Sequence, residues 1–387
     1  MKNKNQSIEL EFYKKEGISP VHYKLGDIKK HFEIRSSLYQ LLGLPPNLVR
    51  GKDVLEVAPG SGHNSIYTAA LLPETYDLVE PNPVGCKDID SIFKRFTLDH
   101  TKPKLKQLTL GSFQTKKLYD IVITEGWPGG YLDFDKKMLR KLSSFVKPKG
   151  LMLISFFPPI GGMATYLRRL IGNRIISFND NFKNKTDVLS KAFASHLGNL
   201  KSMSRSNEHW IQDSILNPYI CVAHNTPNLC LKILKNKFEI YNSAPKFNND
   251  WRWYKSLHGQ SKLFNKNFIS EYNKISHSMI DYRIKGINRS EKKNIELEKL
   301  CFNFALITKK NEKYGVEKYV KNIEPFLLKI IDNIKQDLPK NVLQSLIEAN
   351  NLLKKNNIKI KDVSKMKHFS SLFGREQCYL SLINKIN

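Results

Sequence analysis

Residues 54–64 read Val-Leu-Glu-Val-Ala-Pro-Gly-Ser-Gly-His-Asn, and this stretch decides the fold. An apolar run turns through Pro-Gly-Ser-Gly into a stretch of helical character that ends near Leu72. The order indicates a strand, a tight glycine turn and a helix, the first unit of a doubly wound α/β domain. Glycines are needed where a Cβ would collide with a closely bound ligand. The next apolar run, 76–80, ends in Glu80, which is placed to accept hydrogen bonds from ribose hydroxyls.

The turn also indicates which kind of ligand it holds. A dinucleotide site has Gly-x-Gly-x-x-Gly, with a helix N-terminus aimed at the pyrophosphate. Here Ser65 stands at the third glycine position, and Glu56 would repel phosphates. A carboxylate at this place suits a cationic ligand that carries an amino group. A similar domain that binds another nucleotide, or none, is the alternative.

In these residues the chain resembles the class I methyltransferases that use S-adenosylmethionine (SAM). The first motif of that family is an acidic residue followed by x-Gly-x-Gly-x-Gly. The chain matches it at Glu56, Gly60 and Gly62. It departs from the motif at Ala58, which replaces the first glycine, and Glu80 matches the ribose-binding acid of the family.

The resemblance covers about residues 50–158. Segments 119–126 and 145–157 match the fourth and fifth strands of the family at the expected spacing. The fold implied is α/β, a doubly wound seven-stranded sheet. Further expected parts are an N-terminal helical cap, a helical lid insertion and a C-terminal helical subdomain.

SAM is the cofactor that the resemblance implies. Glu56 would organise the ammonium group of SAM, and Glu80 would hold its ribose. Ser112 and Phe113 occupy the place that usually contacts adenine, although an acidic residue is common there. The residues expected to bind SAM are Glu56, Ala58, Pro59, Gly60, Ser61, Gly62, Glu80, Asn82, Ser112, Phe113, Glu125 and Gly126.

The chain divides into three parts in this interpretation. Residues 1–50 form the cap, 51–260 the SAM-binding domain with a lid at about 160–217, and 261–387 the helical subdomain. The sequence predicts the sixth strand at 238–244.

Two further segments complete that interpretation. The seventh strand is predicted at 251–257, and a loop-and-helix element at 373–379. In the cap, Asp27 can begin a helix that runs towards Leu42. His31 and Arg35 lie on this helix and could face the site, but an exposed position is favoured for each.

Composition narrows the setting. No run of eighteen apolar residues indicates a membrane span, and the charged start is unlike a signal peptide. The five cysteines are scattered without metal-ligand spacing, which favours a reducing compartment, the cytoplasm. No metal site is expected.

The formal net charge of +27 has two interpretations. Of the 63 basic residues, 51 are lysines, and asparagine and isoleucine are also abundant, as codon bias in an A+T-rich genome would produce. Proteins that read nucleic acids favour arginine for bidentate contacts. We therefore favour a solvated basic surface, with an electrostatic footprint for an anionic partner as the alternative.

The acceptor is suggested by the residues after the fourth strand. Methyltransferases that act on exocyclic amines carry Asp/Asn-Pro-Pro-aromatic there, whereas this chain has Glu125-Gly-Trp-Pro128. The departure favours O-methylation of a hydroxyl over N-methylation of a small amine. Such a reaction needs donor and acceptor held in line and a group that removes the proton.

The general base is sought in the lid. Segment 208–218 combines His209, Asp213, two amides and a tryptophan. His209 and Asp213 lie one helical turn apart and can share a face. The alternative is a solvated lid helix whose Trp210 packs inward. The candidate catalytic residues are His209, Asp213, Glu125 and His63.

The arrangement as a whole resembles bacterial class I methyltransferases, some of them of surface-polysaccharide or glycan pathways. The favoured function is methyl transfer to a small molecule or glycan. A tRNA or rRNA methyltransferase, and a noncatalytic protein that binds SAM, are the alternatives. The sequence does not indicate the oligomeric state.

Overall fold

The computed structural model describes residues 7–19, 22, 23, 25–96, 99–201, 203–235, 237–311 and 313–385. The chain forms two compact units. The first, here called the sheet unit, is drawn from 1–156, 225–272 and 377–387. The second, the helical unit, is drawn from 157–224 and 273–376. The chain therefore leaves the sheet unit twice and returns to it at its end.

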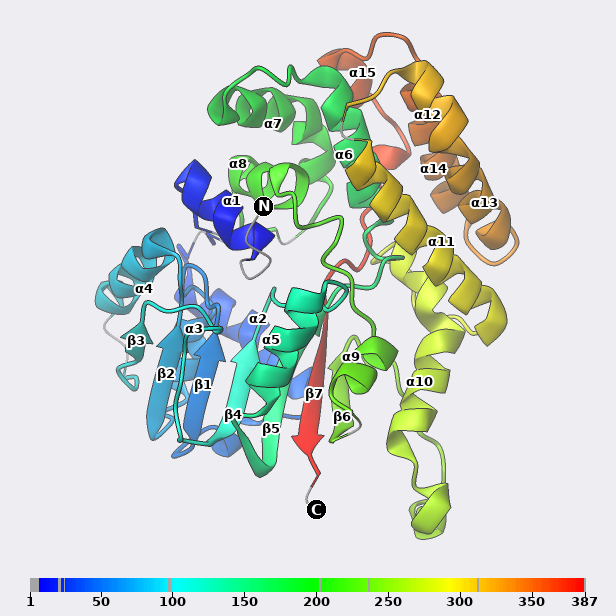
Figure 1. The fold of residues 1–387 in the computed structure, drawn as a ribbon. Coiled ribbons are helices and arrows are strands. Elements are labelled where there is room, and N and C mark those ends of the chain that lie inside the picture. Colours follow the sequence, from blue (N-terminus) through cyan, green and yellow to red (C-terminus); the bar gives the residue numbers. More distant parts are fainter. Residues whose placement is uncertain are drawn as a thin grey trace. The chain divides into compact units, whose positions relative to one another are not determined.

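A seven-stranded sheet forms the centre of the sheet unit, in the order β3-β2-β1-β4-β5-β7-β6 (Figure 1). β1 to β5 pair in parallel, and β7 runs antiparallel between β5 and β6. The predicted doubly wound seven-stranded sheet is confirmed. The strands are β1 Asp53–Val57, β2 Thr75–Val79, β3 Lys104–Lys106, β4 Tyr119–Thr124, β5 Val146–Phe156, β6 Phe238–Ala244 and β7 Cys378–Asn384.

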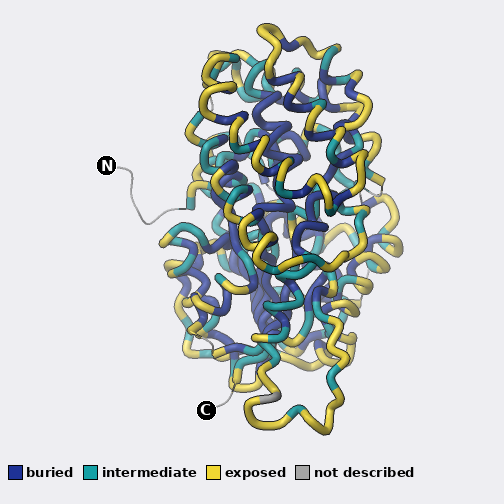
Figure 2. The backbone as a smooth tube through the Cα atoms, turned by 90° about the vertical axis from the view of Figure 1, so that its right-hand side faces the viewer, coloured by how far each residue is buried: buried dark blue, intermediate teal, exposed yellow. Residues whose placement is uncertain are grey.

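The central strands are continuous apolar runs because helices cover both faces of the sheet. Val54, Leu78 and Val122 are fully buried, and the tube of Figure 2 is dark blue through the strands. Figure 1 shows α5 in front of the sheet and α2 behind it. The helices of this unit are α1 Ile8–Glu16, α2 Ile28–Leu41, α3 Ser65–Ala70, α4 Pro83–Arg95, α5 Asp133–Ser143 and α9 Pro227–Ile233, with α10 Phe264–Ile275 continuing into the helical unit.

The predicted sixth strand, 238–244, is confirmed, but the predicted seventh strand is wrong. Segment 251–257 holds only a short turn, η3 Tyr254–Ser256, on an exposed loop. The seventh strand is Cys378–Asn384, so 373–379 is no loop-and-helix element. Residues 378–384 pair with β5 on one side and with β6 on the other, and Leu380 and Leu382 are buried there.

The helical unit is built around α6, Met163–Ile175, most of whose residues are buried. Buried Arg168 donates hydrogen bonds from this helix to the carbonyl oxygens of Phe369, Ser370 and Leu372. Across the described residues, no helix has the length and apolar character needed to cross a membrane. The other helices are α7 Phe182–Gly198, α8 Asn207–Trp210, the π-helix η2 Ile211–Leu216, η5 Ser276–Ile280, α11 Glu291–Lys310, α12 Val316–Asn322, α13 Glu324–Ile334, α14 Lys340–Leu353, α15 Ile360–Ser364 and η6 Phe369–Ser371.

The units do not follow the predicted division into 1–50, 51–260 and 261–387. The segment predicted as a lid, 160–217, packs with the later helices, because α6 is buried on most of its surface and contacts α11 and α14. Closure of this segment over a site stays a prediction.

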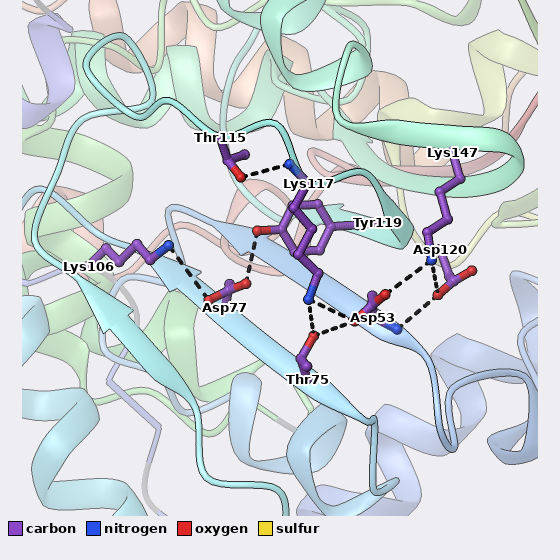
Figure 3. Close-up of polar contacts among 9 residues, drawn as sticks. All are labelled: Asp53, Thr75, Asp77, Lys106, Thr115, Lys117, Tyr119, Asp120 and Lys147. Atoms are coloured by element: carbon purple, nitrogen blue, oxygen red, sulfur yellow. Dashed lines mark hydrogen bonds and ion pairs between the residues drawn. The ribbon is translucent and has the colours of Figure 1, made fainter.

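Charged side chains gather at the amino ends of the strands (Figure 3). The Asp53 carboxylate, at the start of β1, accepts hydrogen bonds from Lys147 at 3.1 Å and Thr75 at 2.7 Å, and pairs with Lys117 at 2.7 Å. Lys147 also bonds Asp120, at 2.9 Å. Hydrogen bonding from Lys117 is the largest cause that holds the pKa of Asp53 well below its ordinary value. At this edge of the sheet, the aspartates are therefore balanced by lysines of the same unit.

Candidate active site

The glycine turn after β1 lies in the left-handed region of backbone space. The φ angles are +56° at Ala58, +61° at Gly60 and +76° at Gly62. Ala58 thus adopts a left-handed conformation that favours glycine, despite its Cβ. A Cβ at Gly62 would lie 2.8 Å from Cγ1 of Ile89, so α4 packs directly on the turn. Glycine is required there for both reasons.

Glu80, just after β2, is tied to this turn. One carboxylate oxygen accepts the N–H of Gly60 at 2.9 Å, and the other accepts that of Asn82 at 2.8 Å. Asn82 in turn caps α4 by accepting the N–H of Val84, and its amide donates to the carbonyl of Ile18 at 2.8 Å. Burial raises the pKa of Glu80 to about 7. The structure thus brings the predicted residues Gly60, Glu80 and Asn82 together.

Glu56, the fourth residue of β1, is buried rather than open to solvent. Its carboxylate accepts a hydrogen bond from the hydroxyl of Tyr76, on the neighbouring strand. Burial raises the pKa of Glu56 to about 7, and the negative charge of Glu125 adds to the rise. Burial disfavours the charged form of this carboxylate, so it is readily protonated near pH 7.

Arg35 and Glu125 form a buried ion pair that the sequence did not indicate. The Arg35 guanidinium donates to both carboxylate oxygens of Glu125, over 2.9 Å from Nη1 to Oε2. The amide of Asn64 donates to the same Oε2 at 3.2 Å. Burial works to lower the pKa of Arg35, but the charge of Glu125 outweighs it and holds that pKa well above its ordinary value.

The favoured exposed positions of His31 and Arg35 are therefore wrong. Both side chains are buried, because α2 presents them to the glycine turn and to the end of β4. Nε2 of His31 lies 2.8 Å from the carbonyl oxygen of His63. The missed signal is spacing: His31, Arg35 and Tyr39 follow one another at four-residue intervals and share one face of the helix.

His63 is engaged within the turn. Its Nδ1 lies 2.7 Å from the hydroxyl of Ser61. Burial, together with a smaller effect of the nearby His22, lowers the pKa of His63 to about 4. The ring of His22 stands 5.4 Å from that of His63, and its Nε2 pairs with Asp88 at 3.0 Å. His63 is therefore neutral near pH 7 and a weak base.

The residues after β4 line the same edge. The backbone N–H of Gly126, where φ is +89°, donates to the hydroxyl of Ser155 at 2.7 Å. The indole N–H of Trp127 is buried and has no hydrogen-bond partner among the described residues. A buried donor of this kind is costly unless a ligand or water satisfies it.

The two residues expected to contact adenine, Ser112 and Phe113, lie in different environments. Phe113 is buried, packs edge-on against Phe145 at 5.4 Å and has the ammonium of Lys106 over its ring at 5.1 Å. Ser112 is exposed, and its hydroxyl bonds that of Thr109. β3, the strand that precedes this pair, ends at Lys106. Contact of this pair with a base stays a prediction.

His209 and Asp213 belong to the helical unit. His209 lies in α8 and Asp213 in the π-helix η2 that follows it. The two residues are therefore not joined by the regular α-helical turn that the sequence predicts. Nη1 of Arg205 donates to Asp213 at 2.6 Å. Trp210 is buried and packs edge-on against Phe373, as in the alternative that turns it inward. The catalytic role of His209 stays a prediction.

No family model matches the chain, and no curated protein matches it in sequence. Solved structures do match. A SAM-dependent methyltransferase from Clostridium acetobutylicum aligns with 40% of this chain and 58% of its own, at 18% identity and a TM-score of 0.29. The magnesium protoporphyrin IX methyltransferase of Synechocystis, with bound SAM, aligns with 40% and 79%, at 17% identity and 0.31.

An N-methyltransferase from Bradyrhizobium japonicum aligns with 33% of this chain and 69% of its own, at 14% identity and a TM-score of 0.28. The chain spans half the length of a matched chain from Thermoplasma acidophilum. Scores of this size leave the assignment of a function to the residues of the site.

Proposed function

We propose that this protein is a SAM-dependent methyltransferase that transfers a methyl group to a hydroxyl of a small molecule or glycan. One observation carries the proposal. The Glu80 carboxylate and the N–H of Gly60 meet at the carboxyl edge of the sheet, beside the point where the strand order reverses between β1 and β4. Open α/β sheets bind their ligands at this place.

The charge of the site fits a cationic ligand. Glu56 and Glu80 are both buried with pKa values raised to about 7, because burial disfavours their charged forms. A sulfonium and an ammonium group nearby would favour their charged forms. The same carboxylates would repel the phosphates of a dinucleotide, and the unpartnered indole N–H of Trp127 offers a further polar contact.

The residues of this edge would divide the binding task. Glu80 would accept hydrogen bonds from the ribose hydroxyls while it holds Gly60, and Glu56 would face the amino group. SAM, when bound, supplies a methyl group on a positively charged sulfur. The acceptor oxygen forms the new bond to carbon as the bond from sulfur to carbon breaks, and the hydroxyl proton passes to a base.

We assign that base to His209 rather than to the carboxyl edge. Arg35 and Asn64 donate to Glu125, which leaves its carboxylate poorly placed to accept a proton. The low pKa of His63 makes its ring a weak base. Among the candidates, His209 has the side-chain type suited to proton removal near neutral pH. The glycan acceptor and the bacterial glycan pathways come from resemblance alone.

Calorimetric titration with SAM and with its demethylated product tests the proposal. The intact chain should bind both, and Glu80→Ala should weaken binding by roughly 2–4 kcal/mol, because charge-assisted hydrogen bonds are lost. Glu74→Ala is the matched control, since Glu74 is an exposed carboxylate just before β2.

Thermal melting separates loss of binding from loss of fold in the Glu80 variant, which also gives up its bond to Gly60. A Glu80→Gln variant keeps the shape of the side chain and serves as a second control. Absence of SAM binding by the intact chain, or equal affinity in the Glu80→Ala variant, would overturn the proposal.

A further inference from the structure

The loop 250–263, between β6 and α10, exposes an unusual group of aromatic side chains. Trp251 is 87% exposed, Tyr254 72% and Trp253 65%, the three highest values among the large hydrophobic residues that the structure describes. The loop hangs beyond the lower end of α10 in Figure 1 and is largely yellow in Figure 2. Exposed apolar groups that gather at one place mark a surface for a partner or a membrane.

The loop is held in this exposed position by its own contacts. The Asp250 carboxylate accepts hydrogen bonds from Nε of Arg252 at 2.8 Å, and Nη1 of Arg252 reaches the carbonyl of Lys262 at 3.3 Å. The last contact joins the two ends of the loop. Its stem is fixed to the sheet, because Asn265 accepts the N–H of Ile240 at 2.8 Å on β6.

The charge of the loop is positive. Lys255 places its ammonium 5.4 Å from the ring centre of Trp253, and Lys262 lies 5.7 Å from that of Phe264. Between residues 246 and 266 the sequence has one acidic residue, Asp250, and Arg252 neutralises it. The exposed tip is therefore aromatic and cationic together.

We propose that the loop 250–263 binds the surface of an anionic lipid bilayer. Tryptophan and tyrosine prefer the level of the headgroups, where the ring is desolvated and its polar atom stays hydrated. Trp251, Trp253 and Tyr254 enter that level, while Lys255 and Lys262 attract the anionic headgroups.

Two other partners fit the loop less well. Single-stranded RNA is held in a basic groove with aromatic faces open for stacking, whereas this loop projects and Lys255 lies over Trp253. Glycan hydroxyls need carboxylate or amide partners beside the aromatic ring, and the carboxylate of Asp250 is occupied by Arg252.

The loop lies at the lower side of the sheet in Figure 1, where the parallel strands begin. Glu56, near the end of β1, and Glu80, just after β2, lie at the opposite edge. Bilayer binding through the loop therefore leaves the glycine turn uncovered by lipid. Changes in the loop are expected to leave SAM affinity unchanged.

Co-sedimentation with vesicles tests the proposal. The full chain is mixed with vesicles of phosphatidylcholine alone or with about 30% phosphatidylglycerol, at low and at high salt. We expect binding to the anionic vesicles, weakened by salt. Replacing Trp251, Trp253 and Tyr254 together by alanine should lower the partition coefficient about tenfold or more. Replacing Lys255 and Lys262 by glutamine should lower it about fivefold for each charge.

A matched variant removes three exposed apolar side chains elsewhere, Val320, Leu328 and Ile347, all on the helical unit. It should bind vesicles like the unchanged protein, and melting curves check that each variant folds. Equal binding by the loop variant and the matched variant overturns the proposal, and so does a failure of the unchanged chain to bind anionic vesicles. Retention of tRNA at about 0.2 M salt that disappears with the three aromatic residues, without vesicle binding, would make the loop a nucleic-acid surface instead.

Discussion

The two edges of one sheet treat their carboxylates in opposite ways. At the amino edge, Asp53 and Asp120 are paired with lysines and partly exposed, and the pKa of Asp53 is held well below its ordinary value. At the carboxyl edge, Glu56 and Glu80 are almost fully buried, and burial raises the pKa of each to about 7. Lysines balance the negative charges of the carboxylates at the amino edge. At the carboxyl edge, Glu56 and Glu80 would need a cation from a ligand to balance theirs.

The difference separates structural charge from charge kept for a ligand. A buried carboxylate without a cation destabilises the fold, so its retention at the place where α/β sheets bind ligands points to a use in binding. Glu125 shows the limit of this argument, because it is largely enclosed at the same edge but paired with Arg35. We therefore expect Glu125 to position its surroundings, and Glu56 and Glu80, which form no ion pair among the described residues, to bind.

The largest effect on activity is expected from a residue that belongs to neither edge, His209 of the helical unit. If the carboxyl edge serves to hold the donor, the proton must be removed elsewhere, and His209→Ala should lower methyl transfer by about 10²–10⁴-fold while SAM affinity stays nearly unchanged. Single-turnover assays together with calorimetry measure the two quantities. A loss under about threefold in this variant, with a large loss in His63→Ala, would return proton removal to the carboxyl edge.

The next effect concerns the buried pair. Arg35→Met should destabilise the protein by about 3–5 kcal/mol, because Glu125 then remains buried without its partner. Urea unfolding gives the value. The double variant Arg35→Met with Glu125→Gln should recover much of the loss, since no charge is left uncompensated. The two edges would not differ as proposed if Arg35→Met lowered the free energy of unfolding by no more than Lys147→Met does at the amino edge.

The sequence predicted the sheet because its signals are local. Three segments can each be assigned from a few neighbouring residues: the run 54–57, the glycine turn and the sixth strand, 238–244. The seventh strand was missed because 378–384 becomes a strand only between β5 and β6, whose residues lie far away in the chain. For Arg35 the local spacing on α2 indicated a buried face, but its ion-pair partner, Glu125, lies 90 residues later and could not be read from that spacing.

A smaller effect is the pH dependence of SAM binding. The ribose hydroxyls need the ionised form of Glu80, whose pKa of about 7 lies above the ordinary 4.5. Affinity should therefore rise about tenfold between pH 6 and pH 8. Calorimetry across this range measures it, and Glu80→Gln should bind weakly with a flatter profile. An unchanged affinity in the wild-type protein over these two pH units would show that the carboxylate is already ionised.

The smallest effect is expected at the amino edge. Lys147→Met should cost about 1 kcal/mol or less, because the pair with Asp53 is partly exposed and screened by salt. Since the pKa of Asp53 is lowered in the folded state, its contribution is present above the unfolded value, near 4, and is lost as the pH falls. Glu80 acts in the opposite sense: with its pKa raised, its contribution is present below about 4.5 and is lost as the pH rises towards 7. The free energy of unfolding, measured at pH 3, 5 and 7, should therefore differ least between the Lys147 variant and the wild type at pH 3. A difference that grows as the pH falls would contradict the stabilising role of the Asp53 ion pair at the amino edge.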